Sequence, residues 1–249
     1  MSNYQRNTSM VACIFAVLIV GAIAAGAISY YGTTNWNWNP GTTDFAFEAE
    51  VGATTGTVTL DIDLDNGGVA VSFVDNASLL YDINIEVDNT TLANEGEPTV
   101  TFTSNTIGFD YTSAGVNITL GSGVNYTINI VAANGGVDIE LAEGAHVGDI
   151  DAQVTNGGLS FRMTDDVVLL GSPTFNLDAE AGGISLFVDL PPGVGGSVEC
   201  AANLGGVDID AIGWTEVTPS HYVNDYETAS QTVTIVAVAT VGGISANLA

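Results

Sequence analysis

The chain alternates apolar and polar residues over most of its length, and glycine pairs interrupt the alternation. Apolar side chains occupy every second position in 58–64, and the same period resumes in 69–73. A period of two places alternate side chains on opposite faces of a β-strand, so one face is buried and one is wet. Gly-Gly followed by an aliphatic residue occurs six times, at 67–68, 135–136, 157–158, 182–183, 205–206 and 242–243. The pattern predicts strands joined at recurring glycine corners.

The spacing of the glycine pairs predicts a repeat architecture. The pairs that begin at Gly135, Gly157, Gly182 and Gly205 follow one another in nearly equal steps, and a second corner of the form Leu-x-x-Gly recurs in phase. The interval from Gly67 to Gly135 is close to three such steps, with a degenerate copy inside it at 114–120. A repeat period of roughly 22 to 25 residues is typical of a solenoid coil. We therefore expect an all-β fold, a β-solenoid of stacked two-strand coils, with a β-sandwich as the alternative.

Two strings near the end of the chain resemble a known family. DLPPG at 189–193 is followed by alternation and then by LGGVDI at 204–209. These strings look like the toast-rack or "putative-adhesin" family of bacterial and archaeal surface β-solenoids, and the resemblance spans roughly residues 55–249. It implies a cell-surface domain of unassigned function, with no catalytic residues to carry over.

An uncharged apolar run near the N-terminus predicts export. Residues 10–28 carry no charge, and a helix of this length spans about 28 Å, close to the thickness of a bilayer core. Tyr and Trp residues follow, while Arg6 precedes the run, which predicts that the N-terminus lies inside. We expect a cytoplasmic tail (1–9), a single-pass anchor (10–31), a polar stalk (32–43) and an extracellular body (44–249). A cleaved signal peptide is the alternative.

The charge balance excludes several partners. The chain has two Lys or Arg residues against 29 Asp or Glu residues, which gives a formal net charge of −27. Phosphate contacts require clustered cations, so nucleic acid is excluded as a partner, and so is direct docking onto an anionic membrane. The acidity fits a solvated extracellular surface.

Bound calcium is the second interpretation of the acidity. Carboxylates that alternate along the strands point outward, and stacked coils would bring such groups about 5 Å apart, which is costly unless a cation lies between them. No calcium-loop signature is present. The candidate calcium ligands are Asp61, Asp63, Asp65, Asp138, Glu140, Asp208 and Asp210.

If the body is exported, four Asn-x-Ser/Thr triplets are candidate sites of N-glycosylation. Asn76, Asn89, Asn117 and Asn125 each begin an Asn-x-Ser/Thr triplet in the first half of the body. Such triplets also arise by chance in sequence rich in Asn and Thr. If the source organism glycosylates surface proteins, these side chains are expected acceptors.

The repeat fails between Gly206 and Gly242, where the step is much longer than the others. The insertion, about 212–230, carries Trp214, His221, Tyr222 and Tyr226. Loops inserted into repeats often lie on a binding face, so these side chains are candidates for an aromatic patch that binds protein or carbohydrate. The alternative is a flap that covers one end of the body. An uncovered end would allow a second copy to stack there.

No catalytic constellation is evident in the sequence. The two histidines, His146 and His221, have no metal-ligand spacing, and no phosphate loop or dinucleotide fingerprint is present. We therefore predict a membrane-anchored structural or adhesion module, with calcium as the one candidate cofactor. Alternatives are a self-assembling filament or coat subunit and, less favoured, a polysaccharide-acting enzyme.

Overall fold

A computed structural model describes residues 41–249, and these residues form an all-β fold around one mixed 16-stranded sheet. The all-β prediction is confirmed. The expected tail, anchor and most of the stalk lie in residues 1–40, outside the described residues. Within residues 41–249, no helix is both long enough and apolar enough to cross a membrane.

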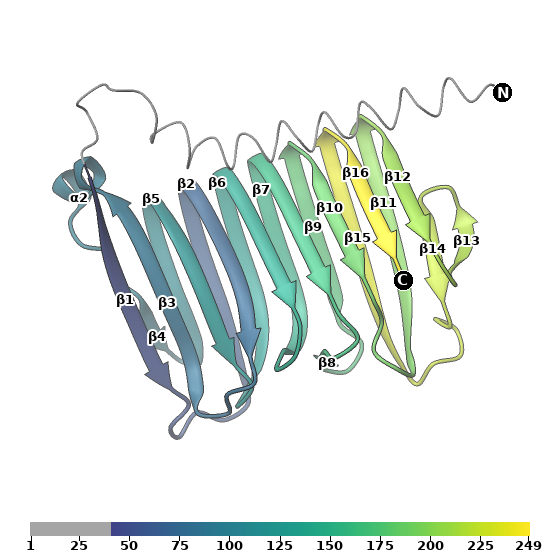
Figure 1. Cartoon of the computed structure of the whole chain (residues 1–249), viewed down its shortest axis with the longest axis horizontal. Coiled ribbons are helices and arrows are strands. Elements are labelled where there is room, and N and C mark those ends of the chain that lie inside the picture. Colours follow the sequence, from purple (N-terminus) through teal and green to yellow (C-terminus); the bar gives the residue numbers. More distant parts are fainter. Residues whose placement is uncertain (1–40) are drawn as a thin grey trace.

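The strands form two layers, which Figure 1 shows one behind the other. Four long strands contribute to both layers because each of them bends at its glycine pair or, in β5, at the equivalent Ala114-Gly115. These are β2 (Thr57–Val74), β5 (Thr106–Gly121), β6 (Asn125–Leu141) and β7 (His146–Met163). We call the half before each bend the leading layer and the half after it the trailing layer.

The remaining strands each belong to one layer. The leading layer also contains β4 (Thr101–Thr103), β8 (Val168–Leu169), β9 (Thr174–Ala181), β11 (Val194–Leu204), β13 (Thr215–Thr218), β14 (His221–Asn224) and β15 (Gln231–Val241). The trailing layer also contains β1 (Thr42–Glu50), β3 (Leu79–Asp88), β10 (Ile184–Val188), β12 (Val207–Ala211) and β16 (Ile244–Leu248). One short helix, α2 (Asn89–Glu95), follows β3, and Asp88 caps its N-terminus.

A single hydrophobic core fills the space between the layers. In β2, alternate residues from Val58 to Leu64 are buried before the glycine pair, and Val69 and Val71 are buried after it. Both halves belong to one continuous apolar cluster, so the bend turns each strand around the core and leaves its polar residues outside. Burial of one such aliphatic side chain contributes roughly 1.5–3 kcal/mol, which makes the alternation the main determinant of the fold.

The glycine pairs stack directly on one another. A Cβ atom on Gly135 would lie 1.4 Å from the carbonyl oxygen of Gly67, and its φ of +151° lies in a region that L-residues rarely adopt. The same clash recurs along the stack at Gly157, Gly182 and Gly242. The repeat therefore requires glycine at the first position of each pair because the backbones approach too closely for a side chain.

Asparagines beside three of the pairs form a ladder along the same corner. The Asn134 side-chain amide donates to Oδ1 of Asn66 at 3.2 Å, and the Asn156 amide donates to Oδ1 of Asn134 at 3.1 Å. Each strand thus aligns with the next through its side chains as well as its backbone, which explains why the recurring motif begins with Asn in the first part of the stack.

The order of the stack differs from the order of the sequence. Gly67 lies beside Gly135 although the two are far apart in the sequence, because β3, α2, β4 and β5 are placed on the outer side of β2. At the other end, β15 pairs with both β9 and β11, and β16 pairs with both β10 and β12. The last two-strand unit of the chain thus fills a place between earlier units, and the connection that leads to it contains β13 and β14, which account for the long final step in the spacing.

The two layers end differently at the β11–β12 end of the body. In the leading layer, β14 pairs antiparallel with β11, and β13 pairs with β14. In the trailing layer, β12 pairs with β16 and no further described strand follows. The insertion therefore covers half of this end.

Candidate functional site

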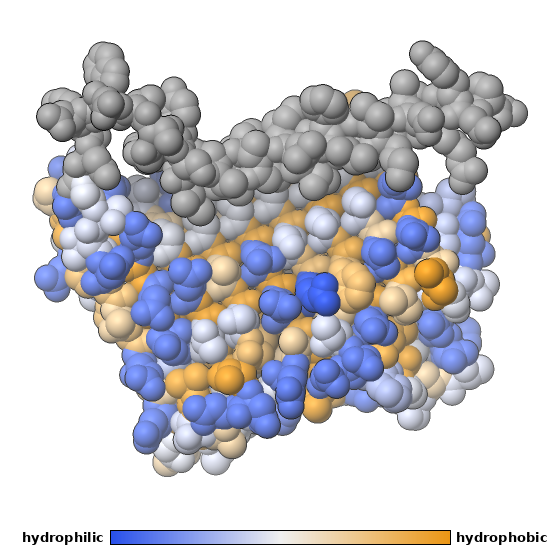
Figure 2. All heavy atoms as spheres, in the orientation of Figure 1, coloured by the Kyte–Doolittle hydropathy of each residue, from blue (hydrophilic) through white to orange (hydrophobic). Residues whose placement is uncertain are grey.

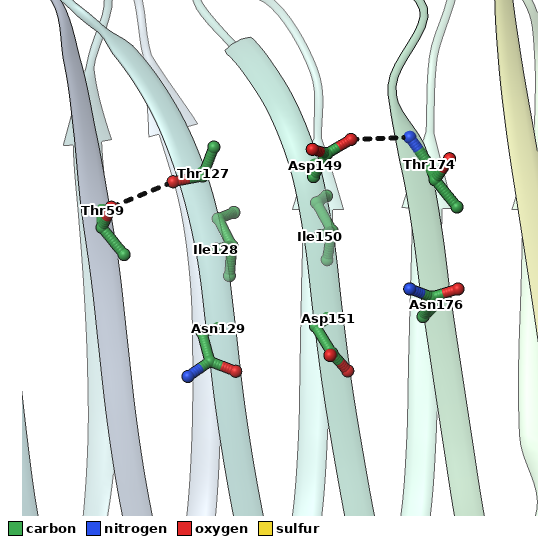
Figure 3. Close-up of a pocket in the computed structure, with 9 residues that line it drawn as sticks. All are labelled: Thr59, Thr127, Ile128, Asn129, Asp149, Ile150, Asp151, Thr174 and Asn176. Carbon is green, nitrogen blue, oxygen red and sulfur yellow. Dashed lines mark hydrogen bonds between the residues drawn. The ribbon is translucent and has the colours of Figure 1, made fainter.

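A polar hollow of about 410 Å³ crosses four strands of the leading layer. Figure 3 shows its side chains in two rows across β2, β6, β7 and β9. We call it the β2–β9 groove, and its polar lining is Thr59, Thr127, Asn129, Asp149, Asp151, Thr174 and Asn176. The side chains of Ile128 and Ile150 are buried beneath it.

A β-bulge in β7 shapes the groove. Tyr126 pairs with Val147 but Ile128 pairs with Ile150, so Gly148 and Asp149 together face a single residue of β6. The extra residue turns Asp149 toward β9, where its Oδ1 accepts a hydrogen bond of 2.9 Å from the backbone N–H of Thr174. Bulges redirect side chains in this way and are common beside functional sites.

Several polar groups in the groove keep hydrogen-bonding capacity for a ligand. The Thr59 and Thr127 hydroxyls bond to each other at 3.1 Å, and the Asn129 amide donates to Oδ1 of Asp61 at 2.6 Å. The exposed Asn176 side chain makes no hydrogen bond to any other described residue. Amide donors, amide acceptors and carboxylates thus lie side by side on a rigid sheet, which is a suitable set for a ligand rich in hydroxyl groups.

A second hollow of about 380 Å³ adjoins the groove and shares Asn129 with it. Its lining includes Asp61, Asp63 and Asp110, and Asp63 pairs in register with Asp110. Partial burial, with repulsion from Asp110, Asp65 and Asp61, raises the pKa of Asp63 above its usual value. This region therefore repels anionic ligands and favours neutral or cationic ones.

The seven candidate calcium ligands lie at three separate places. Asp61, Asp63 and Asp65 lie on the leading layer, Asp138 and Glu140 on the trailing half of β6, and Asp208 and Asp210 on β12. Within residues 41–249, no group of three or more His, Cys, Asp or Glu side chains has a geometry suited to a metal ion. Calcium binding stays a prediction, with Asp61, Asp63 and Asp65 beside Asp110 as its most acidic location.

The expected ladder of carboxylates between stacked strands does not form at the other two places. Asp138 lies between Ala70 and Ser160, and Asp208 lies beside Ser245. Glu140 is instead 3.5 Å from Arg162, whose guanidinium lies 4.5 Å from the centre of the Phe187 ring. The alternation correctly places these carboxylates outside, but no ladder forms because the residues in register on the neighbouring strands are Ser, Asn, Ala or Arg and not Asp or Glu.

The insertion folds as a hairpin against the body. Trp214 is 9 % exposed, and its indole N–H donates to the carbonyl oxygen of Ala249 at 3.2 Å. The Tyr226 hydroxyl bonds to that of Thr234 at 2.9 Å, and Tyr222 packs against the core. These side chains with His221 do not form one exposed aromatic patch; they attach a flap to the end of the leading layer. Partner binding by them stays a prediction.

Ser197 is a residue that sequence reasoning missed. Its hydroxyl lies 3.0 Å from Nε2 of His221, which comes from the insertion 24 residues further along the chain. None of the described carboxylates is hydrogen-bonded to His221, so no orienting third group completes a catalytic triad in residues 41–249. The pair links β14 to β11. The sequence did not predict this contact because the two residues are far apart along the chain.

The four sequons lie at or near the surface. Asn76 is exposed in a turn, where its Oδ1 accepts from the backbone N–H and hydroxyl of Ser78. Asn89 is exposed at the start of α2, Asn117 is exposed on β5, and Asn125 is half-buried at the start of β6. Their glycosylation stays a prediction.

Comparisons with known proteins support the fold. No protein-family model matches the chain, and no curated protein matches it. A solved structure from Clostridium sporogenes, described as a "putative cell adhesion protein", superposes with a TM-score of 0.65 at 13 % identity, over 84 % of this chain and all of that one. A "putative adhesin" from Bacteroides fragilis has a TM-score of 0.31 at 10 % identity, covering 83 % and 97 % of the two chains. The resemblance to the putative-adhesin proteins is thus confirmed for the fold.

Proposed function

We propose that this chain is a membrane-anchored adhesion module on the cell surface that binds neutral polysaccharide through the β2–β9 groove and does not act as a catalyst. The observation that carries the proposal is the groove itself, in which amide, hydroxyl and carboxylate groups from four strands lie in two rows. The description of the Clostridium sporogenes protein with the same fold, a "putative cell adhesion protein", agrees with this role.

The chemistry of the groove favours sugar hydroxyls over other ligands. A hydroxyl group both donates and accepts hydrogen bonds, so it can pair with the Asn176 amide and the Asp151 carboxylate at once. The acidic hollow beside the groove and the net charge of −27 oppose sulfated or carboxylated glycans. Between neutral and acidic glycans, the neutral class therefore matches these groups.

The stacked corners give the groove a fixed geometry. Its residues lie on strands whose spacing depends on the glycine stack and the asparagine ladder, so little ordering is required when a ligand binds. We also propose that the finer architecture is a β-solenoid whose coils do not stack in the order of the sequence. The in-register parallel pairing of the glycine pairs supports this architecture.

The anchoring part of the proposal rests on the sequence. The uncharged run 10–28 and Arg6 before it favour a single-pass helix with the N-terminus inside and the body, residues 44–249, outside the cell. In this arrangement the body lies outside the cell, where external polysaccharide can reach it.

A glycan array tests the binding proposal. Full-length protein in detergent is applied to neutral and acidic glycans, together with a variant that combines Asn129→Ala and Asn176→Ala. We expect binding to neutral glycans alone, and affinity about thirtyfold lower in the variant because two side-chain hydrogen bonds of about 1 kcal/mol each are lost.

The matched control removes two exposed asparagines of the trailing layer, Asn84→Ala with Asn247→Ala. We expect this control to bind like the wild type. Equal binding by all three proteins, or preference for acidic glycans, would contradict the proposal. New reducing ends on the bound glycan would support the polysaccharide-acting enzyme instead.

A further inference from the structure

The trailing layer ends in a strand whose outer edge is unpaired in the described residues. β12 pairs in parallel with β16, where the Ile244 N–H donates to the Gly206 carbonyl at 2.9 Å and the Ile212 N–H donates to the Leu248 carbonyl at 2.8 Å. Since backbone groups alternate sides along a strand, the N–H and C=O groups of Val207, Ile209 and Ala211 point to the open edge. Such an edge is a template for one more strand.

Exposed apolar side chains gather around this edge. Of the seven large hydrophobic side chains exposed in the described chain, four lie at this end: Leu204 at 69 %, Ile212 at 74 %, Val217 at 55 % and Val241 at 48 %. Val207 and Ile209 on β12 itself are only partly buried. Figure 2 shows isolated apolar residues at the same end of the body, among hydrophilic ones. Leu204 and Val241 are paired in register before β12, Ile212 follows β12, and Val217 lies on β13, so exposed apolar side chains flank both ends of this strand. Exposed apolar side chains that lie near an open edge are common at interaction sites.

The opposite open edge of the same layer lacks this apolar surround. β1 carries exposed Asp44, Glu48 and Glu50, while Phe45 and Phe47 pack against the core. None of its large apolar side chains is among the exposed ones. β12 also carries outward carboxylates, so the two ends of the layer differ in their exposed apolar side chains and not in the sign of their charge.

We propose that β12 accepts an additional β-strand from a partner protein, in which apolar residues alternate with Lys or Arg. The apolar residues would cover Val207 and Ile209, and the basic residues would face Asp208 and Asp210, which point outward from β12. Backbone hydrogen bonds supply affinity in this mode of recognition, and the alternating side chains supply specificity.

The charges select a basic partner over a second copy of this chain. Two β12 strands paired with each other would place Asp208 and Asp210 of one copy beside those of the other. A pairing of β12 with β1 of another copy would add Asp44 and Glu48 to the same surface. Like charges directly across a strand pair are destabilising, and both copies carry a net charge of −27.

The site is separate from the proposed polysaccharide groove. The groove lies on the leading layer over β2, β6, β7 and β9, while β12 belongs to the trailing layer at the end of the stack. The hairpin of β13 and β14 already occupies the corresponding place beside β11. Loss of polysaccharide binding and loss of strand binding are therefore separately measurable.

The test uses two synthetic nine-residue peptides, one alternating valine with lysine and one alternating valine with glutamate. Binding to the full-length protein in detergent is followed by fluorescence anisotropy, and amide hydrogen exchange maps the site. We expect the lysine peptide to bind and to protect the amides of Val207, Ile209 and Ala211, and the glutamate peptide not to bind.

Two variants separate strand addition from general attraction of a cation to an acidic protein. Ile209→Pro removes a donor from the open edge and should weaken binding about tenfold, while a proline there leaves the hydrogen bonds to β16 in place. Asp208→Asn with Asp210→Asn should weaken it about fivefold. The control with the same change of charge, Asp138→Asn with Asp178→Asn, should bind within about twofold of the wild type because both residues lie away from β12.

Three results would overturn the proposal. Equal weakening by both pairs of Asp→Asn changes would show non-specific charge attraction, even if Ile209→Pro failed to fold. Protection of β1 amides by the peptide would place the site at the other end. A dimer in sedimentation whose β12 amides are protected without peptide would show that a second copy occupies the edge.

Discussion

At the scale of one residue, Gly135 shows why the first position of the repeated glycine pair has no room for a side chain. A Cβ on this residue would overlap the Gly67 carbonyl, whereas a Cβ on the adjacent Gly136 would lie 3.7 Å from its nearest neighbour, the Gly158 carbonyl oxygen. The two glycines look alike in the sequence, but they have different roles. The first permits the close stacking, and the second has room for a methyl group.

This difference gives a matched pair of substitutions. We expect Gly135→Ala to lower the free energy of unfolding by about 3 kcal/mol or more, because it adds a backbone clash to an unfavourable φ. Gly136→Ala should change it by less than about 1 kcal/mol. Urea unfolding followed by circular dichroism measures both, and similar losses in the two variants would contradict the proposed role of the stack.

Tyr126 provides a pH-dependent prediction. It is fully buried, its hydroxyl donates to the Leu80 carbonyl at 2.6 Å, and burial raises its pKa to about 12. The unfolded chain ionises near pH 10 while the folded chain does not, so stability from this group is constant below pH 10 and falls as the pH rises from 10 to 12.

Tyr126→Phe isolates this contribution. At neutral pH the variant should be less stable by about 1 kcal/mol, because the Leu80 carbonyl loses its donor. Between pH 9 and 12 the wild type should lose about 2 kcal/mol more than the variant. The measurement is urea unfolding at each pH, and parallel pH profiles for the two proteins would refute the assignment.

At the scale of elements, the insertion is a hairpin that pairs with β11 and is fixed by the buried side chain of Trp214. The Trp214 ring lies over Gly196, where an added Cβ would come within 2.5 Å of the indole, and its N–H bonds to the last residue of the chain. The same hairpin exposes Val217. The contact between Trp214 and Gly196 therefore joins β11, the hairpin and the C-terminus.

Trp214→Ala should release the hairpin from β11. We expect a loss of about 3 kcal/mol in stability and faster amide exchange in β14. Val217→Ala in the same hairpin should change stability by less than about 0.5 kcal/mol, because this side chain is exposed. If the two variants behave alike in thermal unfolding and exchange, the hairpin does not depend on Trp214.

The sequence predicts strands and corners well because both depend on local chemistry. Alternation identifies the buried face of β2, and the recurring glycines identify where each strand bends. The order of stacking was not predictable, because the spacing reveals the length of a connection and not which strand lies beside it. The groove was missed for the same reason: the bulge at Gly148 and Asp149 and the pairing of Asp63 with Asp110 exist only across strands.

At the scale of the whole molecule, the body presents different surfaces in different places. The leading layer holds the groove and the acidic hollow, and the trailing layer holds the Glu140–Arg162 pair. The β12 end exposes several apolar side chains, and its outer edge is unpaired within residues 41–249. A rigid body with several independent surfaces suits a protein that acts by binding. It also explains how one acidic chain would recognise a neutral glycan and a basic strand at separate sites.

The central claim is that this body mediates adhesion through the β2–β9 groove. The most direct measurement displays the full-length protein on cells and counts those that adhere to a surface coated with the neutral glycan identified on the array. We predict adhesion with the wild type and with the Asn84→Ala, Asn247→Ala control, and loss of most adhesion with Asn129→Ala, Asn176→Ala. Adhesion that is equal for all three at equal surface expression would contradict the account.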